Sequence, residues 1–310
     1  MALEILEVSK RYRLSRKYAL RSVSWSSEDG NIIGLTGHNG AGKSTLMGIL
    51  SGNIKPSYGE VRIDSGQNIL RHPNKCRETF AFMTQSYAYL RGVTPQEALM
   101  SAAMIRGISR NQARSNIAEY FEALKLDAWA KSPSESLSGG VLRLVSLGMA
   151  LIQGASYTLL DEPTNDVDPE RRSLMWDFLR TQTDKGRTFI VTSHNLDEID
   201  ANSSHVLVLN NGELVYSGQT KSLSKLTDNV RFEVVYDTRF IPDYSKNYIS
   251  EAVGNKVVYI VPRKDIISFL RSIENQMTAG TIHDFNAAFT PRFADIYESL
   301  QALNTRELEK

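Results

Sequence analysis

The sequence predicts an α/β protein of two domains, a large one over residues 1–220 and a small α+β one over residues 221–310. In the large domain, a compact apolar run from Asn31 to Thr36 is followed at once by a glycine-rich loop and then by helix formers. Helix-start signals then interrupt this pattern between about residues 87 and 150, and strand-like runs resume afterwards. Since 310 residues exceed the size at which one hydrophobic core usually stops growing, two domains are the natural expectation.

The composition is that of a folded globular protein whose charge indicates no particular partner. Hydrophobic residues make up 41% of the chain and charged residues 23%, both ordinary values. Thirty-six basic residues balance 35 acidic ones, so we expect no nucleic acid as partner. The sequence has no apolar run long enough to span a bilayer and no secretory-type N-terminus, and its lone Cys76 cannot form an internal disulfide. These features predict a cytoplasmic protein whose role at a membrane would need another subunit.

The large domain opens with short strands that lead to the glycine-rich loop. Leu3 to Val8 and Leu20 to Ser24 are strand-like, and the apolar run that ends at Thr36 feeds the loop. The residues after it, Ser44 to Leu50, favour a helix that ends near Gly52. A strand, a glycine loop and a helix in this order are the context that a phosphate-binding loop requires.

A small helical insertion and the rest of the α/β core follow. Thr94, Pro95 and Glu97 combine an N-cap, a first-turn proline and a capping-box glutamate, and Ser109 with Gln112 repeats the pattern. The strands expected around and after the insertion are Thr79 to Met83, Tyr157 to Leu160, Thr188 to Ser193 and His205 to Leu209, with a turn at Asn210 to Gly212.

The last third of the chain has a different pattern of predicted strands and helices. Arg231 to Tyr236 and Lys256 to Val261 are strand-like, and Asp265 to Glu274 favours a helix with one apolar face. We also expect a final helix whose apolar stripe packs into a small core rather than binding a ligand; the stripe is Phe293, Ile296, Tyr297 and Leu300.

The loop from Gly37 to Ser44 has the chemistry of a phosphate cradle. Its glycines permit a backbone that turns several N–H groups toward one point, and Lys43 adds a positive charge for the β- and γ-phosphates. The hydroxyl of Ser44 is expected to hold Mg²⁺. A turn that bound nothing would leave a buried lysine without a partner, so we predict nucleotide binding.

A second chemical motif is the pair Asp161 and Glu162, which ends the apolar run that begins at Tyr157. Side chains alternate along an extended backbone, so we expect the two carboxylates to point to opposite faces and to have different roles. One acid would serve the metal and the other would lie beside the attacking water.

The residues Leu137, Ser138, Gly139 and Gly140 lie between these motifs, and here the sequence resembles the ABC ATPase family from residue 3 to about residue 220. The resemblance implies a P-loop ABC ATPase fold with a mixed sheet and a helical insertion. It implies ATP and Mg²⁺ as ligands, with the metal held by Ser44, Gln85 and Asp161. Glu162 becomes the general base, with Gln85 and His194 organising the γ-phosphate and the water. The residues implied to bind nucleotide are Tyr12, with Tyr18 as a rival for the adenine, then Gly37, Asn39, Gly40, Gly42, Lys43, Ser44 and Thr45, and Ser138, Gly139 and Gly140 acting on the nucleotide of a second subunit.

The resemblance also implies partners. Two copies would form a homodimer around ATP, and its closure would drive a separate transmembrane permease, as in two-component exporters of the ABC-2 type, from the inner face of the membrane. Tyr87, Tyr89 and Leu90, close to Gln85, are candidate anchors for that permease or parts of the core.

Two other functions are alternatives. One is a non-transport ABC ATPase acting on ribosomes or DNA, which the single set of motifs, the lack of sustained heptads and the net charge of +1 argue against. The other is a regulatory module that binds ATP with little turnover. Three departures from the family pattern bear on turnover or dimer coupling, namely Val141, Leu144 and Asp166.

Overall fold

A computed structural model describes residues 2–13, 15–27, 29–64, 66–86, 91–220, 229–237 and 248–288. The chain divides into two compact units, Met1–Thr220 and Lys221–Lys310, which we describe separately. The helix predicted around Phe293 to Leu300 lies outside the described residues.

The first unit is built on a mixed six-stranded sheet of order β5-β6-β7-β3-β8-β9. Its first five strands are parallel, and β9 closes one edge antiparallel to β8. Every residue of β3, β6 and β7 is buried, as expected for parallel strands covered on both faces. The strands are β3 (Ile32–Thr36), β5 (Phe80–Met83), β6 (Tyr157–Asp161), β7 (Thr188–Thr192), β8 (His205–Asn210) and β9 (Glu213–Gln219).

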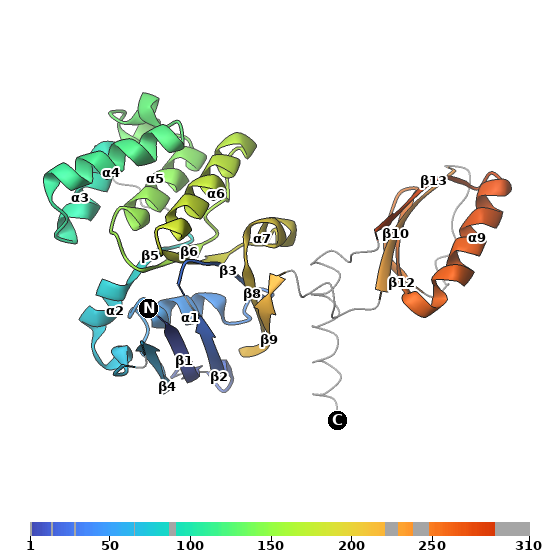
Figure 1. The fold of residues 1–310 in the computed structure, drawn as a ribbon, viewed down its shortest axis with the longest axis horizontal. Helices are drawn as coiled ribbons and strands as arrows, with labels where there is room; N and C mark the ends of the chain where they lie inside the picture. The colour runs from blue at the N-terminus through green and yellow to red at the C-terminus, as the bar shows by residue number, and fades with distance from the viewer. Residues whose placement is uncertain are drawn as a thin grey trace. The chain divides into compact units, whose positions relative to one another are not determined.

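A second, antiparallel sheet of order β2-β1-β4 covers one face of this core, with helix α1 (Lys43–Leu50) between the two sheets (Figure 1). Its strands are β1 (Leu3–Arg11), β2 (Tyr18–Ser27) and β4 (Tyr58–Ile63). Apolar side chains from both sheets and from α1, among them Leu3, Leu46 and Ile33, form one buried cluster. This packing fixes the start of α1, and therefore the glycine loop, against the ends of β3 and β6.

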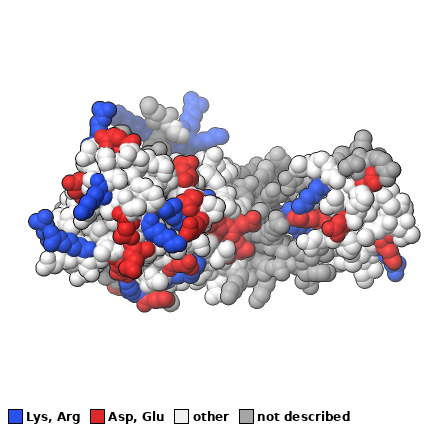
Figure 2. Space-filling view, turned by 90° about the horizontal axis from the view of Figure 1, so that it is seen from above, with Lys and Arg blue, Asp and Glu red and all other residues white. Residues whose placement is uncertain are grey.

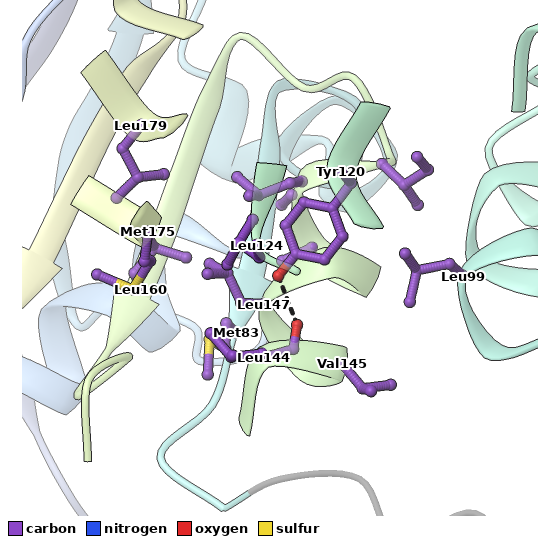
Figure 3. Packing of buried hydrophobic residues seen from close by; sticks show 14 of the residues in the cluster. Met83, Leu99, Tyr120, Leu124, Leu144, Val145, Leu147, Leu160, Met175 and Leu179 are labelled. Carbon is purple, nitrogen blue, oxygen red and sulfur yellow. Dashed lines mark hydrogen bonds between the residues drawn. The ribbon is translucent and has the colours of Figure 1, made fainter. Parts of the chain in front are cut away.

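Helices cover the other face of the six-stranded sheet (Figure 1). The long helices on this face are α3 (Pro95–Ile105), α4 (Arg110–Ala123), α5 (Gly139–Leu151) and α6 (Pro169–Asp184). The shorter helices of this unit are η1 (Ile69–Arg71), α2 (Pro73–Thr79), η2 (Asp127–Trp129), η3 (Ser134–Ser136) and α7 (Leu196–Asn202). The buried Tyr120 of α4 donates its hydroxyl hydrogen to the carbonyl of Leu144 in α5, at 2.6 Å, within a dense apolar cluster (Figure 3).

The helix starts follow the sequence in part. Thr94 and Glu97 form the complete reciprocal capping box at the start of α3. Ser109 accepts the N–H of Gln112 at the start of α4, but the Gln112 side chain donates to Asn116 one turn further on. The expected repeat of the capping box is therefore wrong in its second half, because a glutamine amide has a competing partner at i+4.

The second unit is a four-stranded antiparallel sheet of order β11-β12-β10-β13 with helix α9 (Ile266–Thr278) packed on it. The strands are β10 (Asn229–Tyr236), β11 (Ile249–Val253), β12 (Lys256–Pro262) and β13 (Ile282–Ala288). Alternate residues of β10, Val230, Phe232 and Val234, form its core with Phe269 of α9. Across both units, no described helix is long and apolar enough to cross a membrane.

Candidate functional site

The glycine loop wraps around the N-terminus of α1 and encloses the Lys43 side chain. The Lys43 ammonium donates to the carbonyl oxygens of Gly37 at 2.6 Å and of His38 at 3.3 Å. Gly42 caps the helix with φ of 111°, and a Cβ there would lie 2.6 Å from the carbonyl oxygen of Ala19. Only glycine fits such a position, so the local sequence dictates the shape of the loop.

Around this loop lies a hollow of about 170 Å³. Burial lowers the pKa of Lys43, while the charges of Glu162 and Asp161 oppose that effect. A lysine so placed between carbonyls and carboxylates supplies a positive charge at the base of the hollow, where a phosphate group would be bound. Of the residues expected to bind ligand, the structure brings ten to this hollow; its lining is Ala19, Asn39, Gly40, Gly42, Lys43, Ser44, Thr45, Gln85, Asp161, Glu162 and His194.

Asp161 and Glu162 enter the hollow from the end of β6. The carboxylate of Asp161 accepts from the hydroxyl of Thr192 at 2.6 Å and from that of Ser44 at 3.4 Å. Glu162 has φ of 54°, so the chain has already left the extended conformation at this residue. The expectation of an extended backbone with carboxylates on opposite faces is wrong: the left-handed turn brings both acids to one hollow.

The carboxylate of Glu162 is held by His194, which follows β7. One oxygen accepts the backbone N–H of His194 at 3.2 Å, and the other lies 3.3 Å from the imidazole Nε2. Glu162 is only 2% exposed. Burial raises the pKa of Glu162, and the charge and N–H of His194 act in the opposite direction. A carboxylate with a raised pKa has greater basicity toward a water molecule than an exposed one.

The oxygen donors at this site fit Mg²⁺. Ser44, Gln85 and Asp161 all line the hollow, and each supplies the hard oxygen ligand that this ion prefers. No described group of three or more His, Cys, Asp or Glu side chains is arranged to hold a metal by itself. Mg²⁺ usually keeps several waters and uses one or two protein oxygens together with substrate phosphates, which is the arrangement this donor set allows.

Of the two tyrosines considered for the adenine, Tyr12 lies beside the hollow. Its hydroxyl is 3.3 Å from that of Thr45, on the first turn of α1. Tyr12 is 43% exposed, and the Lys10 ammonium lies 5.1 Å from the centre of its ring. The Arg11 guanidinium lies 5.7 Å from the centre of the Tyr18 ring, so each ring has one neighbouring cation. It is the contact with Thr45, which lines the hollow, that favours Tyr12.

Ser138, Gly139 and Gly140 lie away from this hollow, at the start of α5. Ser138 caps the helix by accepting the N–H of Val141 at 3.4 Å. A side chain at Gly140 would collide with the carbonyl oxygen of Asp166, so glycine is required for the close approach of that loop. These three residues do not line the hollow around Lys43 in their own chain.

The departures at Val141 and Leu144 have a structural explanation. Both side chains are buried in the cluster formed by α3, α4 and α5, where polar or basic side chains would be costly. Nothing in the structure explains Asp166 itself, whose backbone has φ of 62°.

Thr192 is a site residue that the sequence reasoning missed. It lies opposite Asp161 in the β6–β7 register, and its hydroxyl also accepts the N–H of Glu162 at 2.9 Å. The signal available in the sequence is a hydroxyl residue within the strand-like run Thr188 to Ser193, two residues before His194. The proposed anchors Tyr87, Tyr89 and Leu90 lie outside the described residues.

Known proteins resemble the chain in sequence and in fold. Residues 20–165 match the family described as ABC transporter. The human phospholipid-transporting ATPase ABCA3 is 32% identical over 303 residues, covering 93% of this chain and 18% of the relative. The chain thus spans less than a fifth of the curated relatives it matches.

Solved structures share the fold. One, described as the ATP-binding subunit of an ABC transporter, superposes with a TM-score of 0.67 at 23% identity, covering 73% of this chain and 93% of that one. Another, a dimeric post-hydrolysis ATP-binding cassette bound to ADP and Pi, has a TM-score of 0.62 at 23% identity, with 70% and 98% coverage.

Proposed function

Because the chain carries an ABC transporter ATP-binding domain, we propose that its hollow binds ATP with Mg²⁺, hydrolyses it, and energises a transmembrane permease. The observation that carries this proposal is the convergence of Lys43, Ser44, Asp161, Glu162 and His194 on one hollow from three separate chain segments. Each residue type alone is common, but a cation, a hydroxyl and two carboxylates of distinct environment together suit phosphoryl transfer to water.

The residues divide the chemistry among themselves. Lys43 and the N–H groups at the start of α1 bind the β- and γ-phosphates. Ser44 and Asp161, with Gln85, hold Mg²⁺, which neutralises charge on the phosphates when bound. Glu162 takes a proton from the attacking water as general base, and His194 holds the Glu162 carboxylate in place. Tyr12 stacks on the adenine.

A second copy of the chain is proposed to complete the site. Ser138, Gly139 and Gly140 expose a helix N-terminus, which is suited to bind an anion, but they do not line the hollow of their own chain. A head-to-tail homodimer would place them over the partner's nucleotide. The dimeric cassette with ADP and Pi that shares this fold supports the arrangement.

The permease is proposed to dock beside Gln85. A second hollow of about 500 Å³ adjoins the first, and both contain Ser44, Gln85 and Asp161. Its apolar lining includes Phe82 and Ile54, which offer contact area to a helix of the permease. A movement of Gln85 would then change both the nucleotide hollow and the hollow where the permease docks. The domain would lie in the cytoplasm against the inner face of the membrane.

We further propose that the complex is an exporter of the two-component ABC-2 type. The human relative is named as a phospholipid-transporting ATPase, so a phospholipid is the first class of substrate to test. The charge distribution gives no support to a nucleic-acid partner: on the face seen in Figure 2, Lys and Arg side chains are interspersed with Asp and Glu.

The test is ATP hydrolysis by the chain alone and together with its candidate permease in phospholipid vesicles. Stimulated hydrolysis with movement of lipid between leaflets, both abolished in Lys43→Met, would support a transport ATPase. ATP binding without hydrolysis in either condition would favour the regulatory module instead.

A further inference from the structure

The buried carboxylate of Glu198 connects the two chain segments that carry Glu162 and His194. It accepts the hydroxyl hydrogen of Thr164, two residues after Glu162, at 2.9 Å, and that of Ser193, directly before His194, at 3.1 Å. Both bonds go to the same oxygen, Oε2. The other oxygen accepts the indole N–H of Trp176, from α6, at 2.8 Å.

Glu198 occupies the position of a capping-box glutamate, but its carboxylate does not make the capping-box hydrogen bond. Glu198 lies three residues after Asn195, the N-cap of α7, where a glutamate commonly reaches back to the N-cap N–H. Here the Ser193 hydroxyl accepts that N–H at 3.1 Å instead. The Glu198 carboxylate is thereby directed inward, where its side chain is only 6% exposed.

Burying a carboxylate is unfavourable unless its oxygens are well hydrogen-bonded. The three donors to Glu198 are themselves almost fully buried: Thr164, Ser193 and Trp176 are each 4% exposed or less. The guanidinium of Arg172 lies nearby, with its Nε 3.9 Å from Oε1. The carboxylate is therefore held by several separate elements, and it couples the segments after β6 and β7.

We propose that Glu198 is a positioning residue for the hydrolytic site: through Thr164 and Ser193 it fixes the spacing between Glu162 and His194. This inference rests on the proposed function, since the spacing matters for turnover only if Glu162 is the base. Glu198 does not line the hollow and touches no substrate. Its effect would be on how the Glu162 carboxylate is oriented toward water, so it should change kcat and leave ATP binding intact.

The chain offers a matched set of variants. Thr164→Val removes a hydroxyl on the site side of Glu198 with little change in volume. Trp176→Phe removes the bond on the opposite oxygen, away from the site. Glu198→Gln retains an acceptor and should keep more activity than Glu198→Ala. All four lose buried hydrogen bonding, so a merely structural role would lower the Tm of each and would not separate their kcat values.

The experiment measures kcat, the Kd for ATP, Tm, and the amide hydrogen-exchange rate of His194 by NMR. For Thr164→Val we expect kcat to fall about tenfold to a hundredfold with Kd within about twofold of wild type. The His194 amide, which donates to Glu162, should exchange about tenfold faster. Trp176→Phe should lower Tm while changing kcat and His194 exchange by less than about twofold.

The outcomes are distinguishable. Equal effects of Thr164→Val and Trp176→Phe on kcat and on His194 exchange would overturn the positioning role. A wild-type chain without ATP turnover would contradict the proposed function, but faster His194 exchange in Thr164→Val alone would still support the coupling through Glu198.

Discussion

The Glu162 carboxylate binds His194 through both of its oxygens: one accepts the His194 backbone N–H at 3.2 Å and the other lies 3.3 Å from the imidazole Nε2. Two segments that are separated by an entire helix and strand thus meet in a single contact. Burial raises the pKa of Glu162, and the contact with His194 opposes part of that effect, so this contact moderates the basicity of the carboxylate.

A first prediction concerns the pH dependence of turnover. A general base must be deprotonated, so kcat/KM should fall with decreasing pH through the raised pKa of Glu162, that is, above the ordinary glutamate value of 4.5. His194→Ala removes the imidazole, whose charge lowers this pKa. The acidic limb of the profile should therefore move to higher pH in the variant. A limb that stays in place would show that His194 does not tune Glu162.

The same shift predicts a stability effect. Since the pKa of Glu162 is higher in the folded than in the unfolded state, its stabilising contribution is present below the unfolded-state pKa and is lost as pH rises through the folded-state pKa. At high pH the wild-type protein must bury a charged Glu162 carboxylate, whereas Glu162→Gln buries a neutral side chain at every pH. The gain in Tm of the variant over wild type should therefore be larger at about pH 8 than at about pH 4. Exposed Glu122, changed to Gln, should show no comparable trend. Thermal unfolding across pH provides the measurement.

The lysine of the loop should be essential for nucleotide affinity. Lys43→Met retains the buried stem but removes the ammonium that lies against Gly37 and His38, and we expect the Kd for ATP to rise at least about tenfold. The exposed Lys55, changed to Met, is the control. Calorimetric titration with ATP measures the Kd of both variants. Equal Kd values for Lys43→Met and Lys55→Met would argue against the hollow as the phosphate site.

Two glycines of the loop should differ in their tolerance of alanine. Both have positive φ, but a Cβ at Gly42 would lie 2.6 Å from the Ala19 carbonyl oxygen, whereas one at Gly40 meets nothing within 4 Å. Gly40→Ala should cost about 1–2 kcal/mol from backbone strain alone. Gly42→Ala should cost about 3–4 kcal/mol, because the collision adds to the strain. Denaturant unfolding measures both values, and equal losses would contradict the geometry.

The sequence predicts the parts of this fold that local patterns determine. The apolar runs of β3, β6 and β7 and the helix starts at Thr94 and Ser109 appear where expected, because burial and capping follow from adjacent residues. β4 and β13 were not predicted from their own residues. Each exists because a neighbouring strand, β1 or β10, offers it an edge to pair with.

In the site, too, some features follow from local sequence and others from contacts between distant segments. Lys43, Ser44, Asp161, Glu162 and His194 could be named in advance, and the structure brings them together. The left-handed φ of Glu162 and the hydrogen bonds of Thr192 and Glu198 could not be read from local sequence. These features depend on contacts between segments about thirty residues apart, which no periodicity or motif records.

The account is tested most directly by ATP cleavage in Glu162→Gln under single-turnover conditions, with ATP binding measured on the same sample. Glutamine keeps the shape of the side chain but cannot accept the proton of the attacking water. We predict unchanged ATP affinity together with cleavage slowed about 10²- to 10⁴-fold. Cleavage at the wild-type rate would contradict Glu162 as the base and with it the proposed function of the hollow.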